Sequence, residues 1–101
     1  MKTITITSGK QFSIDSLTCR ETEASDLDLI TIREETNPLQ ATVKMRRLML
    51  RVCAQAIKNG GQPEMTDEIL IDQIADAELT EIYKQILEYT GVAQGEAKAT
   101  V

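Results

Sequence analysis

The stretch from Leu39 to Lys58 constrains the fold more than any other part of the sequence, because it carries apolar residues in two stripes at helical spacing. A helix that is apolar over much of its circumference needs other elements on several sides, so we expect it at the centre of the fold. Pro38 can begin this helix, and Asn59-Gly60-Gly61 can end it with a left-handed cap. The stripes are Met45, Leu48, Met49, Val52 and Ala56, and Leu39, Val43, Leu50, Ala54 and Ile57.

The first residues alternate between polar and apolar side chains, which is typical of half-buried strands. The segment from Lys2 to Thr7 predicts a strand with Ile4 and Ile6 on one face, and Gln11 to Ile14 predicts an antiparallel return strand. Gly9 lies between them and can adopt the positive φ that a tight hairpin requires. The chain is therefore expected to begin with a β-hairpin.

The next segment has a weaker pattern. Leu17 to Arg20 alternates once more and predicts a third short strand, which would extend the hairpin into a meander. Ser25 is a plausible N-cap for a helix from Asp26 to Glu35, whose first acidic residues suit the helix dipole. Leu29 to Ile32 also fits a strand, so the sequence leaves both alternatives open here.

Two shorter helices are expected in the C-terminal third. Thr66 is a suitable N-cap for a helix that runs through Ile74, and Asp76 is a suitable cap for a final helix that stops at Gly91. The residues from Val92 to Val101 show no period, and we expect a flexible tail there. The inward faces are expected to be Ile69, Leu70 and Ile74 in the first helix, and Leu79, Ile82, Tyr83, Ile86 and Leu87 in the second.

These elements predict one α+β domain over residues 1–91, in which a hairpin or short meander packs against three to four helices. With 101 residues, the chain is long enough for a single modest core. Apolar residues make up 42% of the chain but aromatic residues only 3%, so the core should be aliphatic. Aliphatic surroundings are a weak match for a small-molecule pocket, which aromatic side chains usually help to line.

Composition argues against catalysis, and we expect no enzyme, metal or cofactor. The sequence has no His, so it lacks the side chain most often used as a general base or a metal ligand. Cys19 and Cys53 lie far apart in the chain, and we expect both to be buried and reduced. The net charge of −5 disfavours nucleic-acid binding, and no apolar run is long enough for a signal peptide or a membrane span.

Positive charge is concentrated on the central helix, where Lys44, Arg46, Arg47 and Arg51 are four of the eleven basic residues. These side chains could form a docking patch for an acidic partner, or they could pair with Glu34, Glu35 or the acids that follow Glu64. Methionine adapts to varied apolar partners, so a methionine-containing stripe could also form a binding groove. The partner-binding candidates are Met45, Met49, Leu50 and Val52 as groove residues, with Arg47 and Arg51 as flanking charges.

The order of these features resembles the tail assembly chaperones of long-tailed bacteriophages and prophages. The resemblance covers about residues 3 to 91. It rests on the hairpin, the segment from Leu17 to Leu27, the long helix, the loop from Gly60 to Thr66, and Ile71-Asp72-Gln73-Ile74-Ala75-Asp76 with the amphipathic helix that follows.

The resemblance implies a protein that catalyses nothing and acts in the cytoplasm of the bacterial host. Proteins of this family bind the tape measure protein and keep it soluble, and tail tube subunits later displace them. Two alternatives remain open: a structural virion component, such as a head–tail connector or tail subunit, and an acidic regulator that mimics nucleic acid. Self-association into a homo-oligomer is also left open.

Overall fold

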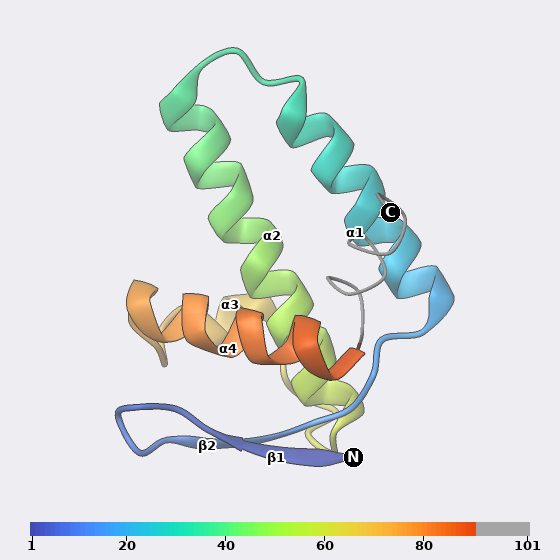
Figure 1. Cartoon of the computed structure of the whole chain (residues 1–101), viewed down its shortest axis with the longest axis vertical. Helices are drawn as coiled ribbons and strands as arrows, with labels where there is room; N and C mark the ends of the chain where they lie inside the picture. Colours follow the sequence, from blue (N-terminus) through green and yellow to red (C-terminus); the bar gives the residue numbers. More distant parts are fainter. Residues whose placement is uncertain (91–101) are drawn as a thin grey trace.

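A two-stranded hairpin precedes four helices in the computed structural model, which describes residues 1–90 (Figure 1). The α+β prediction is therefore confirmed, while the tail predicted over residues 92–101 lies outside the described residues, as does Gly91. The elements are β1 (Lys2–Thr5), β2 (Gln11–Ile14), α1 (Cys19–Arg33), α2 (Pro38–Asn59), α3 (Asp67–Leu70) and α4 (Asp76–Thr90).

The hairpin forms as its alternating pattern predicts. Strands β1 and β2 pair antiparallel, with Lys2 opposite Ile14 and Thr5 opposite Gln11. Gly9 has φ +93° in the connecting turn, a conformation that L-residues with a side chain rarely adopt. Ile4 and Ile6 are both buried, so one face of the hairpin covers the core and the other faces solvent.

The predicted third strand is wrong, because a helix begins where the meander was expected to continue. Thr18 caps α1: its hydroxyl accepts a hydrogen bond from the Glu21 backbone N–H, and the Glu21 carboxylate accepts one from the Thr18 backbone N–H. This capping box satisfies two donors that would otherwise lack partners, and it favours a helix over an extended edge strand. Ser25 consequently lies inside α1 rather than at its start, and Leu29 to Ile32 is helical.

The two cysteines have different environments. Cys53 is fully buried in the second half of α2, as expected, and burial raises the pKa of its thiol, which keeps the group protonated. Cys19 is exposed at the first position of α1, so the prediction that it is buried is wrong.

Helix α2 has the ends that the sequence predicts. The Asn37 side chain accepts hydrogen bonds from the backbone N–H groups of Leu39 and Gln40, and Pro38 is the first helical residue, where no N–H is needed. At the other end Gly61 has φ +121°, and its N–H donates to the carbonyl of Lys58. Together with a hydrogen bond from the N–H of residue 62 to the carbonyl of residue 57, this forms a Schellman cap.

Only the C-terminal half of α2 is central to the fold. The seven buried residues of the helix all lie between Leu48 and Ile57. In the N-terminal half, Leu39 is 73% exposed and Val43 is 49% exposed, although they continue the second apolar stripe. The prediction of a central helix therefore holds for the second half of α2, while its first turns form a projecting helical hairpin with α1 (Figure 1).

Helices α3 and α4 complete the core. Thr66 caps α3 as predicted, but the helix ends at Leu70 rather than at Ile74, and Ile69 points to solvent. In α4 the buried residues repeat at helical spacing, as Leu79, Ile82 and Ile86. Helix α4 crosses α2, and the β-hairpin lies beside α4 (Figure 1). Within residues 1–90, no helix combines the length and apolarity needed to cross a membrane.

Candidate partner-binding site

The six residues singled out as partner-binding candidates all lie on α2, but at different depths. Met45 and Met49 are partly buried and line a shallow groove between α2, α1 and the start of α4. Leu50 and Val52 are only 2% and 6% exposed and belong to the core. In this structure, a partner can therefore reach Met45 and Met49 directly, while Leu50 and Val52 support the fold beneath them.

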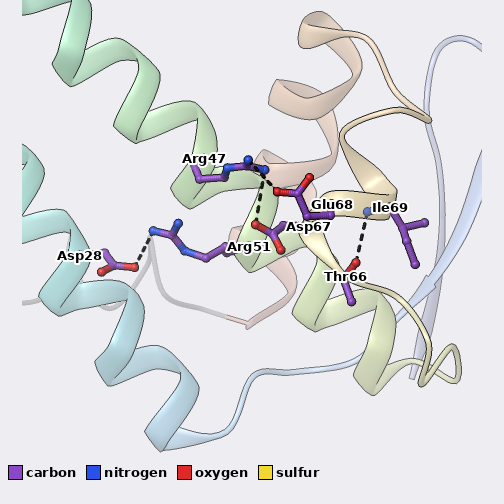
Figure 2. Close-up of polar contacts among 7 residues, drawn as sticks. All are labelled: Asp28, Arg47, Arg51, Thr66, Asp67, Glu68 and Ile69. Carbon is purple, nitrogen blue, oxygen red and sulfur yellow. Dashed lines mark hydrogen bonds and ion pairs between the residues drawn. The ribbon is translucent and has the colours of Figure 1, made fainter.

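Arg47 and Arg51 point in different directions from α2, and each meets carboxylates of a neighbouring helix (Figure 2). Arg47 lies between the two acids of the first turn of α3, with Nη2 3.0 Å from Glu68 Oε1 and Nη1 3.5 Å from Asp67 Oδ2. Arg51 Nη2 donates to Asp28 Oδ2 of α1 at 2.7 Å. The Thr66 cap holds the α3 turn in place, because its hydroxyl accepts from the Ile69 backbone N–H.

The other two basic residues of the cluster from Lys44 to Arg51 are also paired. Lys44 binds Glu35, and Arg46 Nε lies 3.0 Å from Asp76 Oδ1 at the start of α4. Pairing with Glu34, Glu35 or the acids after Glu64 was one of the two alternatives left open by the sequence. It is confirmed for Lys44, Arg46 and Arg47, whereas Arg51 pairs with Asp28, which was not predicted. The positive residues therefore join α2 to its neighbours and do not form a free patch for an acidic partner.

An apolar cleft that the sequence does not reveal lies between α1, α2 and the end of α4. Its volume is about 270 Å³, and it is open to the surface. No periodicity could have predicted it, because it is formed where three helices fail to close completely against one another. The residues that line it are mostly apolar: Leu17, Thr22, Ser25, Asp26, Leu29, Arg33, Met45, Leu48, Val52, Tyr83, Ile86, Leu87 and Thr90.

One edge of the α1–α2 pair is polar and forms an α1–α2 seam. Three acids spaced seven residues apart, Glu21, Asp28 and Glu35, contact partners on the antiparallel helix α2, in the order Asn59, Arg51 and Lys44. The Asn59 amide donates to Glu21 Oε1 at 3.0 Å. Glu21 and Asp28 lie seven residues apart on one edge of α1, and Glu35 follows in the connection after α1 ends at Arg33, so the three contacts form a row.

The electrostatics of this seam favour charged carboxylates. Hydrogen bonding from the Lys44 ammonium, followed by that from the Asn37 backbone N–H, lowers the pKa of Glu35. For Glu21, partial burial acts to raise the pKa, but hydrogen bonds from Thr18 and Asn59 outweigh it and lower the value. Both side chains are therefore ionised at neutral pH.

Large apolar side chains are also exposed outside the cleft. On the helical hairpin these are Leu27 and Ile30 of α1 and Leu39 and Val43 of α2. Within residues 1–90 there is no group of three or more Cys, Asp or Glu side chains placed to hold a metal ion.

No protein-family model matches the chain. No curated protein and no solved structure shows significant similarity to it either. The geometry of the helices is therefore the basis on which a function can be proposed.

Proposed function

We propose that this protein is a tail assembly chaperone of a long-tailed bacteriophage or prophage, which binds the tape measure protein in the bacterial cytoplasm and keeps it soluble until the tail is built. The apolar cleft between α1, α2 and α4 carries the proposal, because it offers apolar contacts at the surface of an acidic protein. A long amphipathic helix exposes an apolar stripe and aggregates unless that stripe is covered.

The physical demands on such a chaperone fit this chain. A helix presents one or two apolar side chains per turn, and a shallow cleft can accept these without enclosing the whole partner. A net charge of −5 keeps the complex from associating further. The cleft is small, so the complex can be weak enough for tail tube subunits to displace the chaperone.

The first test is co-expression with the large helical protein encoded downstream in the same genome. We expect stoichiometric recovery of that protein in soluble form, and its aggregation when the chain is omitted. Recovery of the chain alone, with the large protein soluble by itself, would contradict the proposal. It would favour a structural virion component instead, which should copurify with particles.

A matched pair of variants locates the contact on α2. Met45 lines the apolar cleft, whereas Val43 lies two residues earlier on the same helix, exposed and outside the cleft. We expect Met45→Asp to abolish recovery of the partner and Val43→Asp to leave it unchanged, with a circular dichroism melt to show that both variants fold. Equal loss with the two variants would place the contact outside the cleft.

A further inference from the structure

Helix α1 is held to the protein by less apolar contact than the other long helices. None of its residues is buried, whereas α2 buries seven and α4 buries three. Among the described residues, α1 adds Leu29 and Ile32 to the edge of the core, and both are only partly buried. Because burial of apolar surface is the main stabilising term in folding, α1 is the most weakly attached of the three long helices.

Hollows on both sides of α1 show that its packing on α2 is incomplete. The apolar cleft lies on one side, and a second hollow of about 240 Å³ lies on the other, lined by residues that include Glu21, Asp28 and Arg51. Ser25, between the two, lines both. Well-packed helices leave few voids larger than a water molecule, so α1 rests on α2 along a narrow strip.

The α1–α2 seam aligns this helix without fixing it firmly. In the Arg51–Asp28 pair the side chains are 44% and 45% exposed, so water competes with both partners. Within residues 1–90, Asp28 is the one anion paired with Arg51, and Glu35 is the one anion paired with Lys44. Glu35 lies after the end of α1, so removal of α1 would leave one cation, Arg51, without its anion beside an uncovered apolar strip of α2.

From these observations we propose that α1 is a displaceable cover, and that the α2 surface beneath it binds a helix that carries acidic residues seven apart, as Glu21 and Asp28 are on α1, next to apolar side chains. This inference rests on the proposed function and specifies its binding surface. Helix α1 itself shows which chemistry the surface accepts. An incoming helix must supply carboxylates to Asn59 and Arg51, and apolar side chains to Met45, Leu48 and Val52.

The test uses the full-length chain and a fluorescein-labelled peptide of residues 17–36, in which Cys19 is replaced by Ser. This peptide carries all three seam acids, and its binding is followed by fluorescence anisotropy. Wild type should bind it weakly, because its own α1 competes at high effective concentration. Asp28→Arg should raise the affinity about fivefold, the upper range for one exposed ion pair.

A charge exchange separates displacement from general loosening. In the double variant Asp28→Arg with Arg51→Asp the seam is restored with reversed polarity, so α1 is held again while α2 repels the acidic peptide. Binding should be lost in this variant and should return to the wild-type level with a peptide that carries Asp28→Arg. Equal affinity of the acidic peptide for wild type and both variants would overturn the proposal.

A matched control exchange is available on the same helix. Arg46 and Asp76 form an exposed pair at 3.0 Å that joins α2 to α4 and does not involve α1. Arg46→Asp with Asp76→Arg should leave the peptide affinity at the wild-type value. A change as large as that caused by the α1–α2 exchange would contradict the proposal.

Hydrogen exchange supplies an independent readout. Amides of α1 should exchange at least about 100-fold faster than those from Leu48 to Ile57, because α1 can open locally while the core stays folded. Equal protection of both segments would contradict the proposal.

If the peptide binds as expected but the tape measure protein is not recovered, the proposed binding surface on α2 stands and the partner is a different protein. If only the tape measure protein binds, α1 is no cover and the chaperone proposal stands.

Discussion

Gly60 brings the end of α2 against the second strand of the hairpin at a distance that leaves no room for a β-carbon. A β-carbon there would lie 2.3 Å from the Ser13 carbonyl oxygen and 2.6 Å from the Ile14 α-carbon. Those neighbours are backbone atoms and cannot turn aside, and the Ser13 hydroxyl also donates to the Gly60 carbonyl at 2.9 Å. We expect Gly60→Ala to lower the free energy of unfolding by about 2 kcal/mol or more, as measured by urea denaturation.

Gly9 is the natural control for this substitution, because a β-carbon there would have no neighbour within 4 Å. Its positive φ alone opposes a side chain, so Gly9→Ala should cost about 1 kcal/mol. If both variants lost the same stability, the close approach of α2 and β2 would not be the reason for the glycine at position 60.

For single residues, the sequence predicts the features that depend on near neighbours in the chain. The turn at Gly9 and the cap of α2 depend on local backbone conformation, and both predictions are confirmed. The exposure of Cys19 and the closeness of Gly60 to Ser13 depend on where distant segments meet. No local pattern carries that information, so the environment of Cys19 was predicted wrongly and the closeness of Gly60 to Ser13 was not predicted.

Two carboxylates of α4 join it to the hairpin: Glu81 accepts hydrogen bonds from Thr7, and Glu78 accepts them from Ser8 and Lys10. Hydrogen bonds from the Ala75 backbone N–H, the Ser8 hydroxyl and the Lys10 ammonium lower the pKa of Glu78 to about 2, from the ordinary 4.5. A lowered folded-state pKa means that the stabilisation is complete above pH 4.5 and is lost as the pH falls toward 2. Ser8 and Lys10 belong to the hairpin turn, so acid should weaken this junction.

We expect Glu78→Gln to lower the thermal midpoint at pH 7, because the neutral amide cannot replace the charge-assisted hydrogen bonds. The difference from wild type should shrink as the pH is lowered from 4.5 to 2, since wild type then loses the same interaction. Thermal melts at several pH values check this. A difference that stayed constant over that range would show that the carboxylate charge does not stabilise the junction.

Element types were predictable where the pattern was long, and α1 shows why shorter patterns fail. Its apolar residues are spread around the helix, with Leu29 and Ile32 turned inward and Leu27 and Ile30 outward, so no stripe marks it. The capping box at Thr18 was the available signal, but the alternation of the next residues suggested a strand. The α1–α2 seam was equally hidden, because its spacing has meaning only once α1 and α2 lie antiparallel.

At the scale of the whole molecule, the structure divides into a packed base and a projecting helical hairpin (Figure 1). One connected core contains the buried residues of the hairpin strands, the second half of α2, α3 and α4. The two apolar stripes predicted a central helix, yet the buried residues of α2 all lie in its C-terminal half. How far the neighbouring elements extend along α2 depends on their lengths and crossing angles, and the hydrophobic periodicity of the sequence does not encode these.

This division predicts that residues of the same stripe on α2 contribute very unequally to stability. Ile57 is fully buried, so Ile57→Ala removes apolar contact and leaves a cavity, at a cost of about 3 kcal/mol. Val43→Ala, in the exposed half, should change the free energy of unfolding by less than about 0.5 kcal/mol. Urea denaturation with an unchanged m value would show that both variants unfold in the same cooperative transition. Comparable losses at the two positions would mean that the projecting half of α2 is covered in solution, as it would be if copies of the chain associate through it.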